Sequence, residues 1–292
     1  MPRHALLSML AMSLVLGLVV GLVSLPAASL ADDFKPKTPE TAFSGKLRPD
    51  ILGISNESSA ESARAVFDSL FKGHNDTKTD IQQHKLGDAN YVAALNFSLP
   101  AGPKQNGEML STSFSSPASA NRAYFVARNL TFAQDQQPSK ANMIKEVMGK
   151  YGVPTIVGDQ HLYYIYRKGS IMSVGGKYKE ATVLEAIDKP LDPRAAVKLN
   201  GDTVRGSCVA VVKRAQTKAK EPSAMLTDAK GANCDGVLSI QLVPGTPADR
   251  VGIAQFTLLD VKQFVSAAAI DSAALGAGPS EGPIPRGSAP KL

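Results

Sequence analysis

The segment Ser139–Arg167 most strongly limits what this chain can fold into, because it indicates a helix followed at once by a strand. Ser139 is placed to cap the helix, Gly152 to end it, and Pro154 prevents its continuation. Four apolar side chains recur at the spacing of one helical face: Ile144, Val147, Met148 and Tyr151. His161–Arg167 is rich in aromatic and β-branched residues at strand length, which predicts that successive side chains lie on opposite faces of a sheet.

Further elements follow from the same periodicities. A second amphipathic helix is predicted at about 58–73, with Ser58 and Glu61 in capping-box spacing and Gly73 as its end. A last helix is predicted at about 260–274. The remaining strand candidates are Tyr91–Leu99, Glu108–Ser116, Arg122–Phe132, Cys208–Lys213, Gly236–Val243 and Arg250–Leu259.

The order of these elements predicts an α+β fold, with an antiparallel sheet and helices packed on one of its faces. Because a helix followed by strands occurs twice, the order also suggests two helix-plus-meander repeats, at 50–134 and 138–274. The predicted domain spans 50–274. A polar, proline-broken lead-in at 32–49 precedes it, and a Gly/Pro/Ser-rich tail at 275–292, predicted to be disordered, follows it.

The first 31 residues have the three-part layout of a secretory signal peptide. A basic start at Arg3 precedes a long apolar run, and Ser29 and Ala31 stand where a signal peptidase reads the chain, so cleavage is expected after Ala31. The expected location is the bacterial periplasm or the medium. The competing interpretation is an uncleaved leader that anchors the protein in the inner membrane facing the periplasm, because about 20 apolar residues can span a bilayer.

Two cysteines, Cys208 and Cys234, are the only ones in the chain. An even pair in an exported protein usually closes in the oxidising compartment, so the sequence predicts a structural disulfide. A redox-active pair would more often have C-x-x-C spacing, which this pair lacks.

The charge excess is mild. The chain carries a net charge of +6, and without the predicted leader, which holds one Arg, 31 basic and 26 acidic residues leave +5. Local basic density at Lys213–Lys220 would allow weak attraction to anionic surfaces such as lipid head groups or cell-wall polymers. Solvated loops and strand ends are the simpler interpretation, and no nucleic-acid partner is expected.

Two short motifs carry a family resemblance. Lys150–Thr155 matches a "KYG-x-P-[ST]" turn, and Asp50–Ile54 matches an early "D-I-x-G-I" helix start. In these features the chain resembles a family of uncharacterised bacterial periplasmic and envelope proteins. Asn56 and Glu57 stand where that family usually has Gly-Met, so the helix entry should differ in detail.

The helix, the "yG-x-P" turn and the sheet that follows are more distantly similar to two binding modules. These are the small lipoprotein of the outer-membrane β-barrel assembly machine and the β-lactamase inhibitor protein. The resemblance implies a sheet face or loops that grip another protein, and it carries over no catalytic residues.

No catalytic or cofactor motif is present: the chain lacks G-x-S-x-G, H-E-x-x-H and C-x-x-C. The polar stretch 73–88 contains His74 and His84 but fits no metal site, and it is interpreted as a loop that joins a helix to a strand. His161 could act as a general base only if an acid approached it in the fold. We therefore assign no catalytic residue, no metal and no cofactor.

The predicted strand 161–167 supplies the one candidate binding patch. Tyr and Arg favour interface centres, which makes candidates of Tyr163, Tyr164, Tyr166, Arg167 and Lys168. The simpler interpretation places one tyrosine face under a helix and leaves the other half exposed.

Together these features predict an exported, non-enzymatic envelope protein that binds or helps to assemble a protein partner. The first alternative is a hydrolase that acts on an envelope polymer or peptide. The second is a structural or stress protein with weak affinity for anionic surfaces through Lys213–Lys220.

Overall fold

The computed structural model describes residues 35–43, 45, 48–172, 178–191, 208–217 and 222–276. The predicted leader and its cleavage position lie outside these residues, as does the predicted tail beyond Gly276. The helices are α1 (Ala60–Leu70), α2 (Lys140–Tyr151), α3 (Glu180–Ala186), α5 (Cys208–Thr217), α6 (Pro222–Gly231) and α7 (Val261–Gly276). The strands are β1 (Lys78–Leu86), β2 (Ala89–Leu99), β3 (Gly107–Phe114), β4 (Ala123–Thr131), β5 (Ile156–Gly158), β6 (His161–Arg167), β7 (Ser170–Ile171), β8 (Gly236–Pro244) and β9 (Val251–Asp260).

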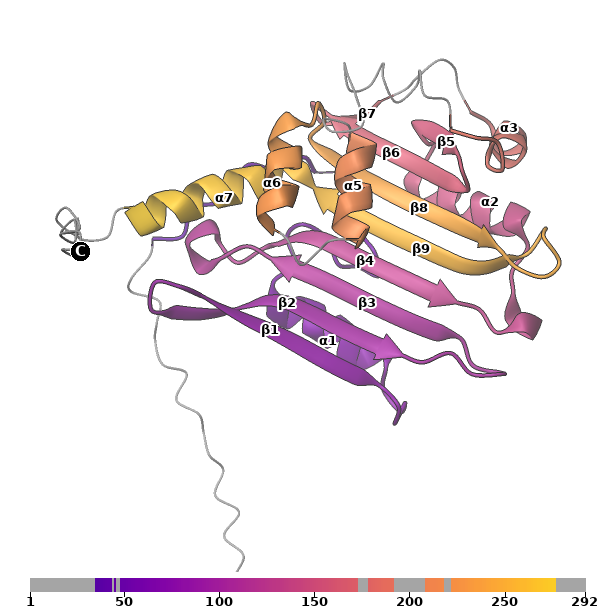
Figure 1. The fold of residues 1–292 in the computed structure, drawn as a ribbon, viewed down its shortest axis with the longest axis horizontal. Coiled ribbons are helices and arrows are strands. Elements are labelled where there is room, and N and C mark those ends of the chain that lie inside the picture. The colour runs from indigo at the N-terminus through magenta and orange to yellow at the C-terminus, as the bar shows by residue number, and fades with distance from the viewer. Residues whose placement is uncertain are drawn as a thin grey trace, which may run out of the picture. The chain divides into compact units, whose positions relative to one another are not determined.

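The nine described strands form one antiparallel sheet, which confirms the predicted α+β class (Figure 1). The strand order is β1-β2-β3-β4-β9-β8-β6-β5, and β7 pairs with β6 outside this path. The centre of the sheet is the pairing of β4 with β9, which runs from Phe125 opposite Leu259 to Thr131 opposite Ile253.

The two halves of the domain have the same order of elements on either side of this central pair. The first half is α1, β1, β2, β3, β4, and the second is α2, β5, β6, β8, β9 with additional elements between β6 and β8. In the first half residues 100–106 connect the corresponding strands, whereas in the second half residues 168–235 do so. This long insertion contains β7, α3, α5 and α6.

Helices cover both faces of the sheet, where the sequence predicted one. On the first face α1, α2 and α3 bury apolar side chains against strands of both halves, and we call this cluster the first core. On the opposite face α5 and α6 pack over β6, β8 and the end of β9, in a second core. Figure 1 shows α5 and α6 in front of the sheet and α1 and α2 behind it. Strand β6 serves both cores by alternation, with Leu162, Tyr164 and Tyr166 in the first and Tyr163 and Ile165 in the second.

Helix α5 contributes several side chains to the second core. The prediction of a strand at Cys208–Lys213 was therefore wrong, because these residues begin helix α5. A short apolar run does not by itself distinguish a strand from a buried helix. The buried side chains recur at helical spacing and include Cys208, Val211, Val212 and Ala215. The residues that follow, Lys213–Gln216, are good helix formers and extend the helix beyond the apolar run.

Strand β1 corrects a second prediction, because part of the supposed polar loop 73–88 is a strand at the edge of the sheet. From Lys78 to Lys85 every side chain is exposed, and only Leu86 is buried. An edge strand without a helix over it gains little from apolar residues, and charged ones discourage pairing with other chains. The polar composition that suggested a loop therefore fits an edge position equally well.

The predicted helix ends are mostly confirmed. Ser139 caps α2 by accepting a hydrogen bond from the backbone of Asn142, and Gly152 ends it with a positive φ of 82°. In α1 the capping residue is Ser59 rather than Ser58, and it accepts from the backbone of Ser62.

The first core extends into residues 35–43, which the sequence predicted as a flexible lead-in. Phe43 is fully buried and packs edge-on against Tyr166, with 4.9 Å between the ring centroids. Its ring occupies the space beside Gly236, where an added Cβ would lie 2.6 Å from a ring carbon. Position 236 therefore accepts no side chain while Phe43 is docked.

Asp260, at the end of β9, ties this segment to helix α7. Its buried carboxylate accepts hydrogen bonds from the Thr41 hydroxyl at 2.5 Å and the Gln263 backbone at 2.8 Å. The Ala42 backbone and the Asn56 side chain donate to it as well. Burial penalises the charged form and raises the pKa of Asp260 to about 6, although these hydrogen bonds oppose the rise.

We predict that Asp260 makes the protein less stable at neutral pH than in mild acid. The folded state binds the proton more tightly than the unfolded chain, so the stabilisation is complete below pH 3.8 and lost as the pH rises through about 6. The free energy of unfolding of the native protein, minus that of Asp260→Asn, should fall by about 2.5 kcal/mol between pH 4 and pH 7. Urea unfolding of both proteins across this range measures the difference, and a difference that does not change with pH would contradict the prediction.

Candidate functional site

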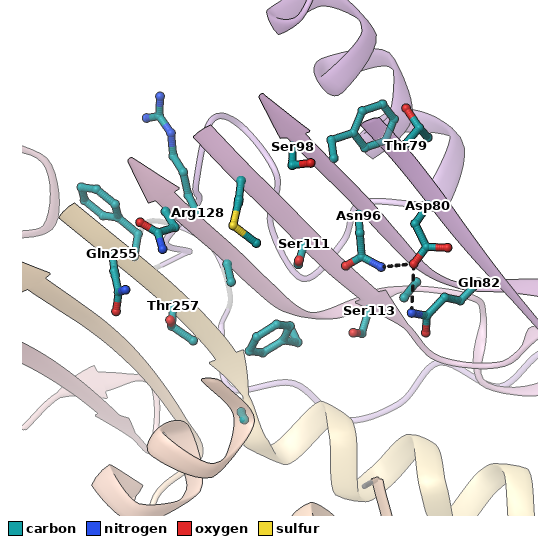
Figure 2. A pocket seen from close by; sticks show the side chains of 18 of the residues that line it. Thr79, Asp80, Gln82, Asn96, Ser98, Ser111, Ser113, Arg128, Gln255 and Thr257 are labelled. Carbon is teal, nitrogen blue, oxygen red and sulfur yellow. Dashed lines mark hydrogen bonds between the residues drawn. The ribbon is translucent and has the colours of Figure 1, made fainter. Parts of the chain in front are cut away.

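A hollow lies on the second face of the sheet, over the half that α5 and α6 leave uncovered. Its volume is about 510 Å³, and it is floored by strands β1 to β4 and β9 (Figure 2). Ala215 of α5 also lines it, so the covering helix stands at its side. We call the sheet side chains that face this hollow the open face.

The open face consists of three rows of side chains that run across paired strands. The strand registers place the members of each row opposite one another. The first row is Asp80, Asn96, Ser111, Ala127 and Thr257; the second is Lys78, Ser98, Met109, Asn129 and Gln255; the third is Gln82, Ala94, Ser113 and Phe125. Most of these groups are uncharged amides and hydroxyls, which both donate and accept hydrogen bonds.

Local sequence explains why the open face is polar. In β2 and β3 the apolar side chains alternate with small polar ones, and the apolar set, which includes Leu95, Phe97 and Leu110, enters the first core. Because side chains in a strand alternate between faces, Asn96, Ser98 and Ser111 must point the other way. Met109 is an apolar exception, with 54% of its surface exposed.

Hydrogen bonds organise the outer edge of the open face. Asp80 on β1 accepts a hydrogen bond from the Asn96 side chain at 3.2 Å and from the Gln82 side chain at 3.3 Å, as Figure 2 shows. Toward the middle, the Asn129 side-chain oxygen is buried but has no hydrogen-bond partner among the described residues. An unpaired buried acceptor is uncommon in folded proteins and requires an explanation.

A smaller hollow of about 160 Å³ adjoins this one where β1 to β3 approach α7. Tyr124 lies there with its ring stacked on Phe264, at 4.8 Å between centroids. Burial, as the largest effect, raises the pKa of Tyr124 to about 12, so its hydroxyl is neutral at physiological pH. Asp271 of α7 also lines this hollow and accepts hydrogen bonds from Ser116 and Ser119.

The structure places the three candidate tyrosines of the predicted binding patch inside the protein. Tyr163, Tyr164 and Tyr166 are 1%, 0% and 3% exposed, because β6 lies between two helical layers. Burial raises the pKa of each hydroxyl above its ordinary value of 10. Arg167 is half-buried, and Lys168 is exposed in the turn that leads to β7. These side chains therefore do not form one continuous surface.

The histidines are dispersed. His74 and His84 are exposed, whereas His161 is buried beside Tyr163, and burial lowers its pKa. Its Nδ1 lies 2.6 Å from the Asp159 carbonyl oxygen. In the part of the chain that the structure describes, no three His, Cys, Asp or Glu side chains gather as metal ligands would.

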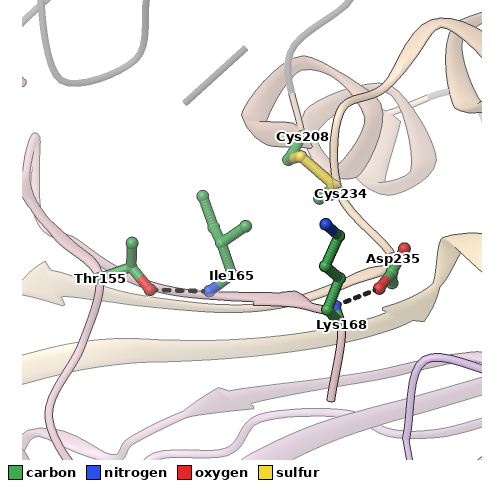
Figure 3. Close-up of a disulfide and its surroundings, with 6 residues drawn as sticks. All are labelled: Thr155, Ile165, Lys168, Cys208, Cys234 and Asp235. Carbon is green, nitrogen blue, oxygen red and sulfur yellow. Dashed lines mark hydrogen bonds between the residues drawn. A yellow bond between two sulfur atoms is a disulfide. The ribbon is translucent and has the colours of Figure 1, made fainter. Parts of the chain in front are cut away.

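The predicted disulfide is present. Cys208 and Cys234 are joined, with their Cα atoms 6.1 Å apart, and the bond fastens the start of α5 to the loop before β8 (Figure 3). That loop is also held from the β6 side, because the Lys168 backbone donates a hydrogen bond of 2.6 Å to Asp235. The start of helix α5 is thus fastened to the second half of the sheet.

The basic stretch predicted to attract anionic surfaces is described only in part. Arg214 forms an ion pair with Asp228 of α6, and this pair neutralises one positive charge of the basic stretch. Lys213 is exposed, and residues 218–220 lie outside the described ranges.

Comparison with protein-family models, with curated protein sequences and with solved structures yields no match. The site is therefore interpreted from its own geometry. None of the helices that the described residues form combines the length and the apolar character that a membrane crossing requires.

Sequence reasoning missed the open face, although a signal for it was present. Ala94, Asn96 and Ser98 alternate with the core residues of β2, and Met109, Ser111 and Ser113 alternate with those of β3. Outward positions that carry small or uncharged residues on two neighbouring strands indicate a solvent-facing surface that lacks the usual charged side chains. Only the strand order shows that these two runs lie side by side with β1, β4 and β9.

We predict that removal of the disulfide destabilises the protein without dismantling the open face. The double substitution Cys208→Ala with Cys234→Ala opens a bond between residues separated by 26 positions. The free energy of unfolding, measured in urea, should fall by about 3.5 kcal/mol on the chain-entropy model. Amide hydrogen exchange should rise in 208–217 more than in β2 and β3, and an equal rise in all three would contradict a local role for the bond.

Proposed function

We propose that this protein is an exported, non-enzymatic binding module of the bacterial envelope, and that it contacts its partner through the open face. The observation that carries the proposal is the unequal cover of the second sheet face. The insertion 168–235 covers one half of that face with α5 and α6, and the other half holds a hollow whose lining combines uncharged polar side chains with apolar ones.

The chemistry of the open face supports binding rather than hydrolysis. Glycoside hydrolysis uses two carboxyl groups that flank the bond to be broken. Among the described residues that line the hollow, Asp80 supplies a carboxylate, and the amides of Asn96 and Gln82 donate to it. Ser111 and Ser113 have no histidine beside them in their rows. Such groups hold a ligand but do not move its protons.

The export and envelope parts of the proposal have other support. The first 31 residues have the layout of a signal peptide, with the cleavage position after Ala31. The closed Cys208–Cys234 bond is of a kind that persists in oxidising compartments such as the periplasm. The motifs at Asp50–Ile54 and Lys150–Thr155 resemble those of periplasmic and envelope proteins, and the helix-plus-sheet order resembles that of known binding modules.

The proposal predicts that a bulky residue in the middle of the open face abolishes partner capture. Ser111 lies at the centre of the first row, and its side chain faces the hollow rather than the core, so Ser111→Trp fills the hollow without overpacking either core. The matched control is Ser170→Trp, which places the same indole at an exposed position of β7. Chemical crosslinking in bacterial cells that export the protein, tagged at its C-terminus, followed by mass spectrometry of the captured material, measures the effect.

We expect the native protein and Ser170→Trp to capture the same envelope component, and Ser111→Trp to lose it. Met109→Trp, at a more exposed position of the same face, guards against a folding defect in Ser111→Trp and should show the same loss. Circular dichroism confirms that each variant is folded. Capture that survives both open-face substitutions would refute the proposed binding surface.

A further inference from the structure

We infer that the ligand of the open face is a neutral, polyhydroxylated chain, namely a strand of an uncharged oligosaccharide; this inference rests on the proposed function. It concerns the chemistry of the ligand, which the rows of side chains on the open face limit in three ways: by charge, by the kind of polar group, and by the shape of the hollow.

The charges around the hollow disfavour an acidic ligand. Among the described residues that line it, the charged ones are Lys78, Asp80 and Arg128. Arg128 is ion-paired with Glu108 at 2.6 Å. Lys78 lies on the edge strand β1, on the same face of the sheet as the carboxylate of Asp80. Recognition of phosphate or carboxylate groups usually relies on clustered Arg or Lys side chains with unengaged donors. The floor of the hollow instead combines amides and hydroxyls with apolar side chains such as Met109 and Ala127.

The polar groups match sugar hydroxyls. Asn, Gln, Ser and Thr side chains both donate and accept, as a sugar hydroxyl does, so either partner can reorient to complete a hydrogen bond. The side-chain oxygen of Asn129 lacks a hydrogen-bond partner among the described residues but is buried, so a ligand hydroxyl would reach it only if the side chain turned toward the hollow.

The same composition disfavours a protein partner on this face. The centres of protein–protein interfaces are enriched in Tyr, Trp, Met and Arg and depleted in Ser. The middle row of the open face instead holds Asn96, Ser111 and Ala127, and the larger apolar side chains, Met109 and Phe125, stand in the outer two rows. Met109, which is exposed, can pack against the C–H faces of sugar rings between the hydrogen-bonding groups, whereas Phe125 is buried in the second core.

The dimensions suit a short stretch of polymer. The rows cross five strands, and four inter-strand spacings of about 4.8 Å give a length of roughly 19 Å. The hollow of about 510 Å³ lies within the range of small-ligand sites. It is bounded on one side by Ala215 of α5 and reaches the edge strand β1, so a chain that lies across the strands can continue beyond this edge.

The test is a titration of the full folded protein with three defined probes. Binding is monitored through amide chemical shifts and measured by calorimetry. The neutral probes are a β-1,4-linked tetramer of N-acetylglucosamine and an α-1,4-linked heptamer of glucose. The acidic probe is an oligomer of galacturonic acid. We expect a neutral probe to bind, with shifts centred on β2 and β3 and with an affinity that does not change between low and high ionic strength.

Variants locate the binding. Asn129→Ala, which removes an amide that lines the hollow, should weaken binding by roughly tenfold, and Ser111→Trp should abolish it. Ser170→Trp should bind as the native protein does. Equal affinities of all variants would overturn the assignment of the ligand to this face.

Each remaining outcome separates this inference from the proposed function. If neither neutral probe binds but cells yield a protein partner that Ser111→Trp loses, the oligosaccharide inference fails and the binding-module proposal stands. Binding of the galacturonic acid oligomer alone, lost at high ionic strength, would likewise overturn the neutral ligand. If no probe binds and no component depends on Ser111, both are refuted.

Discussion

The pairing of β4 with β9 is the contact on which the rest of the structure depends. It is the only one of the described strand pairings that joins the first half to the second, and it makes one sheet of what would otherwise be a four-stranded and a five-stranded unit. A sheet continuous across this seam has two continuous faces. On the first face the helices of both halves complete one core, whereas on the second face the insertion 168–235 belongs to one half only. The open face is the part of the second face that lies across the seam from this cover.

The end of the same seam is fixed by a buried charge. Asp260 closes β9, caps α7 through the Gln263 backbone, and receives Thr41 and Asn56 from the segment before α1. Burying a carboxylate is costly unless hydrogen bonds compensate for the lost water. Here the donors come from segments far apart in the sequence, so they can satisfy the carboxylate only when the N-terminal segment, the β9 end and α7 are all in place. The buried carboxylate thus favours one specific arrangement of the chain around the end of the central strand pair, because only that arrangement supplies its hydrogen-bond donors.

The sequence predicted the features that depend on neighbouring residues along the chain. It missed the features that depend on which parts of the sheet the helices cover. Ser139, Gly152 and the alternation in His161–Arg167 act locally, and the structure confirms α2, its ends and the two-faced packing of β6. The run at Cys208 is apolar in either conformation, and its helix is decided by the sheet surface and disulfide against which it packs. Strand β1 has no apolar alternation because nothing covers it. The tyrosines of β6 suggested a surface because aromatic and basic residues often mark one, but the insertion that buries Tyr163 is far away in the sequence.

The chemical character of the open face can be compared with that of ordinary solvated surfaces in the same chain. Helix α2 presents Lys145, Glu146 and Lys150 to solvent, which is the usual charged composition that keeps a surface hydrated and monomeric. A sheet face that only needed to remain wet would be served by the same residues, and long charged side chains would fill the hollow. The open face instead carries mostly uncharged polar and apolar groups on β2, β3, β4 and β9, and its charged side chains, Lys78 and Asp80, stand on the edge strand β1. Short side chains leave a hollow, and uncharged ones leave it without a counter-ion, which is the combination that a neutral polar ligand would complete.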